Sequence, residues 1–240
     1  SSSPNTLHGN SNAGGSDIIL LKYNSSGTRQ WTKQLGSTGT DIGFKITVDN
    51  SSNIYVTGYT VGSLEDGNTN SGGWDAFLTK FNSSGTKQWT KLIGTSGWDI
   101  AYGRPAVDSS NNIYVVGYTG GGLHGITNSG DNDTFLVKYN HNGTRQWTKL
   151  IGTSAYESGS GVVVDSSNNI YVGGNALGDL DGNTNSGGYD ITLVKYNSSG
   201  TKQWTRQFGS PDNETVMDIA LDSSDNIHLM GYTDGDLDGN

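Results

Sequence analysis

Short stretches in which apolar and polar residues alternate recur along the chain and are separated by turn-forming residues. Residues 75–81 (DAFLTKF) show the two-residue period of a β-strand, and the turn Asn-Ser-Ser-Gly follows at 82–85. Further strands are predicted at 87–93, 101–107 and 112–119, with a tight Asp-Ser-Ser-Asn turn between the last two. No helical period occurs, so the pattern predicts antiparallel β-structure.

This unit of four strands is repeated four times. A tryptophan, an aspartate that opens a strand and an asparagine of the hairpin turn each recur about every 58 residues: Trp31, Trp89, Trp147 and Trp204; Asp17, Asp75, Asp133 and Asp190; Asn53, Asn112, Asn169 and Asn226. Such a period is typical of propellers and solenoids, and four antiparallel strands form a propeller blade. We predict an all-β fold, a β-propeller of four-stranded antiparallel blades in one domain, residues 1–240.

The repeated residues also suggest a family. The pattern DAFLTKFNSSGTKQWTKLIG followed by VDSSNNIYVVGYT resembles the bacterial SBBP-type beta-propeller repeat, in four copies that cover essentially the whole chain. The resemblance implies an extracellular or cell-surface protein and names no activity, because most of the family has no assigned function. Related propellers place the hairpin that contains NIYV on the inside and the KYN and QWT strands on the outside.

With that arrangement, the two ends of the chain are complementary. The chain opens with two outer strands, 17–23 and 29–35, and closes with two inner strands, 216–221 and 227–232. We predict that they form one composite blade, from residues 1–36 plus 210–240, which gives four blades and leaves no unpaired edge. Two alternatives stay open: an eight-bladed ring shared with a second copy, and a piece of a longer array.

Composition narrows the function classes. The chain is only 31% hydrophobic and contains 37 glycines, but 6 Trp, 12 Tyr and 5 Phe favour a packed fold over disorder. A net charge of −9 argues against nucleic-acid or anionic-membrane partners, and no apolar run is long enough to span a bilayer. The lack of cysteine excludes disulfides, thiolate metal sites and cysteine nucleophiles. No basic-then-apolar leader is seen, as expected of a cytosolic or already processed chain.

Four aromatic residues that break the repeat symmetry are candidates for ligand binding. They stand beside Gly, Ser or Ala in loops: Trp74, Trp98, Tyr156 and Tyr189. Aromatic platforms flanked by Asn and Asp suit sugar binding, through stacking and directional polar contacts. The alternative is that these rings pack over the blade edge. The regularly spaced tryptophans are instead expected to fill the space between sheets.

One loop has the ligand spacing of a calcium site. Residues 178–190 (GDLDGNTNSGGYD) place oxygen-bearing side chains on alternate residues and add a distal carboxylate: Asp179, Asp181, Asn183, Asn185 and Asp190. The glycine position and the missing flanking helices depart from the calcium-loop pattern, and Asn, Asp and Gly in series also make turns. The loop therefore has two interpretations: it binds calcium, or it is a plain ordered loop.

Each repeat also has one acidic residue just before the first of its two inner strands, and this set of four acids likewise has two interpretations. Its members are Asp41, Asp99, Glu157 and Glu214. They could ring the channel mouth and hold a hydrated cation, or each could accept hydrogen bonds from backbone amides.

Catalytic signals are weak, so we expect no enzyme. The histidines show no ligand spacing, no Gly-x-Ser-x-Gly elbow occurs, and the acids repeat in every unit, whereas an active site needs acids in different environments. The sequence predicts a non-enzymatic extracellular or cell-surface module for binding or assembly, with an unidentified protein or glycan as partner. The alternatives are a lectin-like carbohydrate binder, a self-associating structural subunit and a propeller glycosidase.

Overall fold

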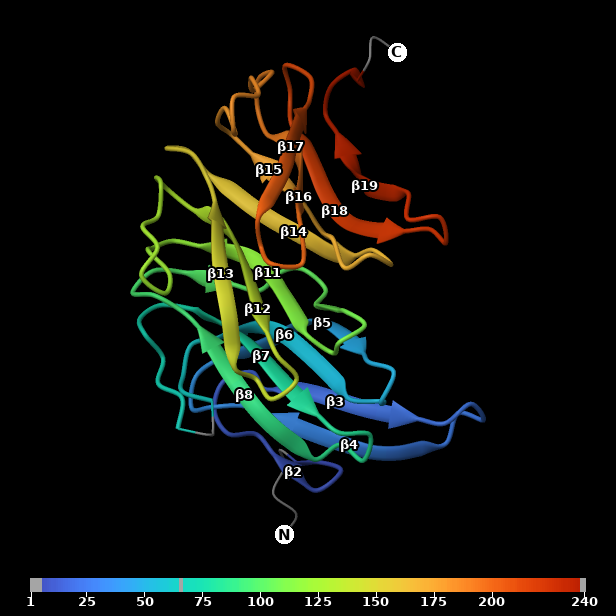
Figure 1. Cartoon of the computed structure of the whole chain (residues 1–240). Helices are drawn as coiled ribbons and strands as arrows, with labels where there is room; N and C mark the ends of the chain where they lie inside the picture. The colour runs from blue at the N-terminus through green and yellow to red at the C-terminus, as the bar shows by residue number, and fades with distance from the viewer. Residues whose placement is uncertain (1–5, 65–66, 238–240) are drawn as a thin grey trace.

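The computed structural model describes residues 6–64 and 67–237, and the regular structure within these ranges is entirely β (Figure 1). Three blades follow one another along the chain, each a single antiparallel sheet of four strands, with the first strand of the second blade split in two. The first contains β5 (Asp41–Val48), β6 (Ile54–Thr60), β7 (Asp75–Phe81) and β8 (Lys87–Ile93). The second contains β9 (Asp99–Ile100), β10 (Ala106–Val107), β11 (Ile113–Thr119), β12 (Asp133–Tyr139) and β13 (Arg145–Ile151). The third contains β14 (Glu157–Val164), β15 (Ile170–Ala176), β16 (Asp190–Tyr196) and β17 (Lys202–Phe208).

Two-stranded sheets flank these blades. The N-terminal side carries the small hairpin β1 (Thr6–Leu7) and β2 (Asn10–Ser11), and then the pair β3 (Ile18–Tyr23) and β4 (Arg29–Leu35). The C-terminal side carries β18 (Glu214–Leu221) and β19 (Ile227–Thr233). In the ranges described, no helix is long and apolar enough to cross a membrane.

All sheets are antiparallel and share one register. In the first blade, Ile54 pairs with Phe81 and Thr60 pairs with Asp75, and the equivalent residues pair in the other two blades. In each complete blade, the strand that begins with IYV and the strand before it form a hairpin at one side of the sheet. The QWT strand forms the opposite edge. Identical registers are expected because a slip of one residue would reverse which side chains face the neighbouring blade.

One predicted strand is broken. The sequence predicted a continuous strand at 101–107, but the structure has β9 before it and β10 at its end, and both pair with β11. Pro105 lacks the N–H that a ladder needs, so the chain leaves the sheet between the two short strands. There the guanidinium of Arg104 donates to the carbonyl oxygen of Ile46 in the preceding blade, at 3.1 Å.

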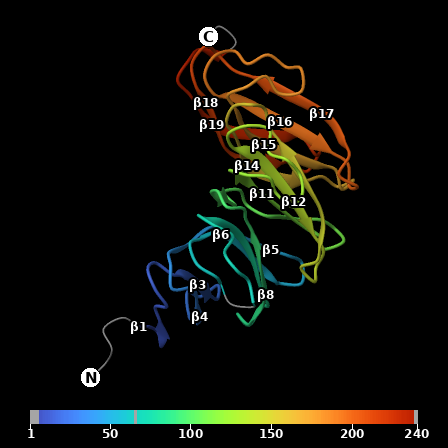
Figure 2. The same ribbon diagram turned by 90° about the vertical axis from the view of Figure 1, so that its left-hand side faces the viewer.

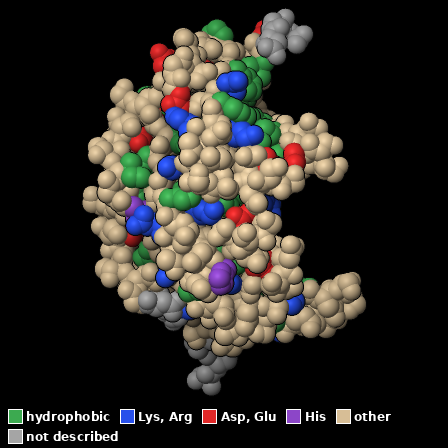
Figure 3. Space-filling model, viewed as in Figure 1, with side chains coloured by type: hydrophobic (Ala, Val, Ile, Leu, Met, Phe, Trp, Pro, Cys, Tyr) green, Lys and Arg blue, Asp and Glu red, His purple; other side chains and the backbone are tan. Residues whose placement is uncertain are grey.

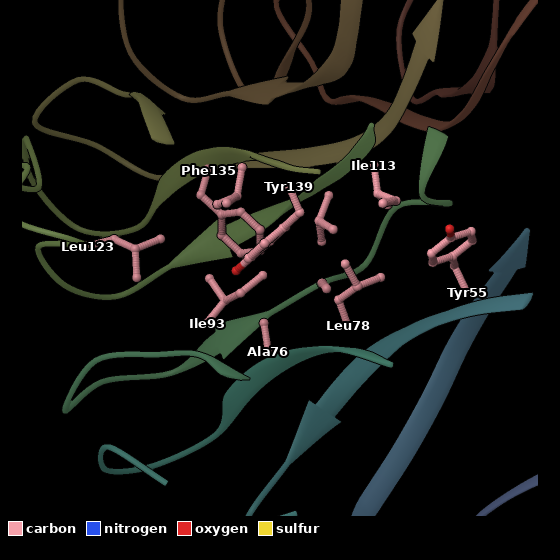
Figure 4. Close-up of a cluster of buried hydrophobic side chains, with 11 residues drawn as sticks. Tyr55, Ala76, Leu78, Ile93, Ile113, Leu123, Phe135 and Tyr139 are labelled. Carbon is pink, nitrogen blue, oxygen red and sulfur yellow. The ribbon is translucent and has the colours of Figure 1, made fainter. Parts of the chain in front are cut away.

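The hydrophobic core lies between neighbouring blades. Leu78 and Ile93 of the first blade pack with Phe135 and Val137 of the second in a buried cluster (Figure 4). Similar clusters join the second blade to the third, and the β3–β4 pair to the first blade. The repeated tryptophans Trp31, Trp89 and Trp147 pack against these clusters, which confirms their predicted role in blade packing.

The predicted composite blade is not formed in the structure. The pairs β3–β4 and β18–β19 are separate sheets, and they lie at opposite ends of a curved row of blades (Figures 1 and 2). Figure 3 shows the resulting open crescent, hollowed on one side. Strands pair at about 4.8 Å, and three complete blades do not turn the chain far enough to bring the two ends within that distance. Within residues 6–64 and 67–237, the structure therefore contains three complete blades and two half-blades. Residues 1–5 and 238–240 of the predicted composite blade lie outside the described residues.

Candidate ligand-binding face

Four positions of the repeat bring aromatic rings together across the blades. Two of the positions directly precede a strand: Trp74 and Tyr189 precede the third strand of a blade, and Trp98 and Tyr156 precede the first. The third position lies three residues after the acid that opens the first strand and holds Phe44 and Tyr102. The fourth is the penultimate residue of the second strand and holds Tyr59, Tyr118 and Tyr232. We call these side chains the aromatic face. Because the strands alternate in direction, these positions all lie at the same end of the blades.

One part of the aromatic face is a stack of flat rings. Trp74 stacks on Tyr59 of its own blade, with centroids 4.6 Å apart and an interplanar angle of 14°. The same indole stacks on Trp98 of the next blade at 5.2 Å and 15°. Trp98 ends the stack and is 59% exposed. A flat, exposed indole backed by two parallel rings is a rigid platform for a ligand.

A second part surrounds a cavity of about 390 Å³ that is lined by the second and third blades and by the C-terminal pair β18–β19. The ring centroids of Phe44 and Tyr102 lie 5.3 Å apart, and these two rings connect the cavity to the stack. The ring of Tyr156 lies 5.9 Å from that of Tyr118 and 5.8 Å from that of Tyr189, measured between centroids. The cavity wall includes Tyr102, Tyr118, Tyr156 and Tyr232, with polar side chains from Ser158, Ser160, Asn175 and Thr215. None of the described residues that line it is charged.

Tyr118 and Tyr156 of this region have raised pKa values. Burial, together with nearby phenols and Asp99, raises the pKa of Tyr118 to about 12. Burial also raises the pKa of Tyr156, whose hydroxyl is hydrogen-bonded to the side chains of Asn132 and Tyr118. The phenols of Tyr118 and Tyr156 therefore act as neutral hydrogen-bonding groups over the whole physiological pH range.

The structure brings all four aromatic residues predicted from the sequence into this face. Trp74 and Trp98 stack on each other, and Tyr156 and Tyr189 are in edge contact. Sequence reasoning missed Phe44, Tyr59, Tyr102 and Tyr118, because they belong to strands or follow them closely and were read as ordinary strand side chains. The recurrence of Tyr59, Tyr118 and Tyr232 at one repeat position was the available signal.

The donors of the predicted calcium loop do not converge. The carboxylate of Asp181 is bound by the Lys202 ammonium and the Thr205 hydroxyl. The Asp179 carboxylate accepts from the backbone N–H of Asn185, and the side-chain amide of Asn183 donates to the carbonyl of Leu180. The Asn185 amide donates to the carbonyls of Ala176 and Gly188 and accepts from the N–H of Gly187, and Asp190 accepts from the N–H of Ser186.

These bonds describe an ordered loop whose oxygens serve its own turns and the neighbouring strand β17. Across the described ranges, no group of three or more His, Cys, Asp or Glu side chains is arranged to hold a metal ion.

The acid column beside the inner strand is buried and bonded to backbone. Asp41, Asp99, Glu157 and Glu214 are at most 1% exposed. Each accepts the N–H of the residue four positions earlier, at 2.5 to 2.8 Å: Ser37, Thr95, Thr153 and Ser210 respectively. The backbone-bonded alternative is therefore the one that the structure shows, and no acid ring opens onto a channel.

Comparison with known proteins identifies the repeat. A family model described as a beta-propeller repeat, SBBP, matches residues 30–65, 146–181 and 203–238. Each match runs from an outer strand through the inner hairpin of the next blade. The copy without a match contains the strand interrupted at Pro105.

Two curated proteins are similar over larger parts of the chain. "Uncharacterized WD repeat-containing protein L264" of Acanthamoeba polyphaga mimivirus is 28% identical over 163 residues, which cover 57% of this chain and 12% of that protein. "Regulatory protein FlaEY" of Caulobacter vibrioides is 27% identical over 239 residues, which cover 87% of this chain and 25% of that protein. The chain thus spans a quarter or less of the length of these relatives.

Two solved structures are similar at low scores. A protein of unknown function from Bacteroides caccae has a TM-score of 0.43 at 9% identity, covering 89% of this chain and 64% of its own. A luciferin-regenerating enzyme has a TM-score of 0.40 at 13% identity, covering 85% of this chain and 59% of its own. Scores this low support no conclusion about function.

Proposed function

Because this chain is built from SBBP-type beta-propeller repeats, we propose that it is a non-enzymatic binding module, outside the cell or on its surface, whose aromatic face holds a neutral carbohydrate. The observation that carries the proposal is the combination of a stacked Trp74–Trp98 platform with an uncharged, tyrosine-lined cavity. Sugar rings stack their C–H faces on aromatic rings and bond their hydroxyls to neutral donors and acceptors.

The electrostatics favour a neutral ligand over an acidic one. The cavity is lined by hydroxyl, amide and aromatic groups, and the chain has a net charge of −9. A net negative charge repels anionic ligands, and no cationic side chain lines the cavity to offset this repulsion. The same lining supplies no carboxylate or imidazole for acid–base chemistry, which supports binding without catalysis.

The test is a glycan array probed with the labelled chain, followed by calorimetry with the best ligand. We expect binding to neutral glycans and weak or no binding to their sialylated or uronic-acid counterparts. Trp98→Ala and Tyr102→Ala remove partly exposed rings of the face, and each should weaken binding about fivefold, since one stacking contact is worth about 1 kcal/mol.

Phe208→Ala is the matched control, because Phe208 is exposed on the outer strand β17, outside the aromatic face. It should leave the affinity unchanged. Binding that is equally strong in all three variants, or a preference for acidic glycans, would contradict the proposal.

A protein partner is the second candidate. Trp and Tyr dominate the energetics of protein interfaces, and Trp98 is an exposed ring on a rigid backing. If neutral glycans fail to bind, and a partner protein binds in a manner that depends on Trp98, the face is a protein-binding surface.

A further inference from the structure

We propose that the third blade provides one specificity-determining subsite per chain, in which the hydroxyls of Ser158 and Ser160 bind a single sugar residue of the ligand. The subsite is the cavity of about 390 Å³ beside this blade. This inference rests on the proposed function and adds to it which residues select the sugar and how many ligands one chain binds.

The first argument is a cross-strand pair that differs in the third blade. The residue after the acid that opens the first strand faces the penultimate residue of the second strand, and that second residue is a tyrosine everywhere except in the third blade. The four pairs, in chain order, are Ile42–Tyr59, Ile100–Tyr118, Ser158–Asn175 and Thr215–Tyr232. The third blade therefore has two small polar side chains where the first two blades have an isoleucine and a tyrosine.

The second argument is a neighbouring position that departs from the repeat in the same way. Three residues after the acid that opens the first strand, the other copies have Phe44, Tyr102 and Met217, and the third blade has Ser160. Ser158, Ser160 and Asn175 all line the cavity. The cavity thus lies where one blade replaces bulky side chains with small polar ones, so we expect one such subsite in the chain and not one in every blade.

Asn175 is a positioning residue of this subsite. It is 4% exposed, its Nδ2 donates to the carbonyl oxygen of Glu214 at 2.7 Å, and its Oδ1 accepts the N–H of Val216 at 3.1 Å. Both ends of the amide are therefore bonded to β18, and the amide links the third blade to the strand that forms another part of the cavity wall.

The serine hydroxyls, in contrast, are available to a ligand. Within residues 6–64 and 67–237, neither the Ser158 nor the Ser160 hydroxyl has a hydrogen-bond partner, and both residues line the cavity. A hydroxyl both donates and accepts, so it can bind a sugar hydroxyl in either direction.

The chemistry of the lining fits a pyranose ring. Tyr102, Tyr118 and Tyr156 supply aromatic surface, while Ser158 and Ser160 supply hydroxyls. A pyranose has the same two kinds of surface, because its C–H faces are apolar and its rim carries hydroxyls. The cavity is at the lower end of the size range of small-molecule sites, roughly 300–1,000 Å³, which suits one sugar residue.

Filling the cavity tests the proposal. Ser160→Tyr gives the third blade the residue that the second blade has at this position, and Ser198→Tyr, the matched control, makes the same change on the exposed turn after β16. The probe is the neutral oligosaccharide that binds best in the glycan array, titrated by calorimetry. We expect one bound oligosaccharide per unaltered chain, an affinity at least tenfold lower in Ser160→Tyr, and no change in Ser198→Tyr.

Ser158→Ala is a second variant, which removes a hydroxyl without adding volume. It should weaken binding about fivefold, the effect of one lost hydrogen bond. Thermal unfolding of each variant shows whether it folds, and Ser158→Ala decides the test if Ser160→Tyr does not.

Three results would overturn the proposal. One is an unchanged affinity in Ser158→Ala and in folded Ser160→Tyr; if Trp98→Ala still weakens binding, the proposed function then stands, with the oligosaccharide on the stacked indoles alone. Another is two or more equivalent oligosaccharides per chain, which would place a site in each blade. The third is an unaltered chain that binds no neutral glycan, which would refute the proposed function and this subsite with it.

Discussion

Asp75 illustrates how one carboxylate can work against the stability of its own fold. It is fully buried, one oxygen accepts the N–H of Ser71 at 2.8 Å, and the other has no partner among the described residues. A Cβ on Gly94 would lie 2.1 Å from the carboxylate carbon, so only glycine fits beside it. Burial is the main cause of the raised pKa of Asp75, and the charge of Asp99 adds to it.

The first prediction follows from the sign of this shift. A carboxyl group whose pKa is higher in the folded state destabilises the fold when ionised, and this cost disappears as pH falls through the folded pKa. In Asp75→Asn, the side-chain amide oxygen still accepts the N–H of Ser71, and an NH2 group replaces the second carboxylate oxygen. We expect this substitution to raise the free energy of unfolding at pH 7 by about 1 kcal/mol. In urea titrations the gain should shrink towards pH 4.

Asp49 is the matched control, because its pKa shifts the other way. Burial alone would raise the pKa, but hydrogen bonds from Asn53, Tyr55 and the Ser51 N–H outweigh it and lower the pKa. The ionised form therefore stabilises the fold at pH values above the unfolded pKa, and this contribution is lost as pH falls through the folded pKa. Asp49→Asn should destabilise the chain at pH 7. Equal effects from both substitutions would refute this account.

At the scale of elements, the loop at 178–190 uses one of its regularly spaced carboxylates to bind a neighbouring strand. Asp181 has a left-handed φ of 54°, and that turn directs its carboxylate to Lys202 and Thr205 on β17. Binding by these partners outweighs burial and lowers the pKa of Asp181. A calcium ion would have to displace the Lys202 ammonium to use this oxygen.

The second prediction is that calcium does not stabilise this loop. We expect the same Tm in millimolar calcium and in chelator. Asp181→Asn, which tolerates the left-handed backbone, should lower Tm slightly and equally in both solutions, since a partly exposed ion pair contributes less than about 1 kcal/mol. A rise in Tm with calcium that Asp181→Asn abolishes would restore the site predicted from the spacing.

Most strands could be predicted because apolar and polar residues alternate within each strand of a repeat, and turn-forming residues separate the strands. The turn aspartates were recognisable for the same reason: Asp49 bonds the N–H groups two and four residues ahead. The break at Pro105 was not foreseen, although the proline itself, which cannot donate to a strand ladder, was the available signal. The partners of Asp181 could not be foreseen either, because Lys202 and Thr205 come from β17, the next strand but one along the chain.

At the scale of the whole molecule, the sequence specified the blades but not how they close. Register and blade packing follow from side chains within one repeat and its neighbour, and these are visible in a tandem sequence. Closure depends on the small rotation between successive blades, accumulated over the row, which no single residue encodes. The grouping of the aromatic face was partly hidden for a related reason: Trp74 and Trp98 meet only across two blades.

The third prediction is that stability falls from the centre of the crescent to its ends. Each blade contacts only its neighbours, so β11 and β12 are covered on both sides, whereas β19 has its outer edge and much of its surface exposed. Local opening is easiest where few side chains are buried. In hydrogen exchange at low protein concentration, amides of β3 and β19 should exchange before those of β11 and β12.

Leu136 and Leu20 provide the matched test of this gradient, because they occupy the same repeat position. Leu136 is buried between two blades, and Leu20 lies beside the open groove of the N-terminal half-blade. Leu136→Ala should cost about 2–5 kcal/mol, as for a core leucine, and Leu20→Ala clearly less. Equal costs, together with uniform exchange along the chain, would mean that the half-blades are as firmly held as the centre, and that the ends are covered in solution even at low concentration.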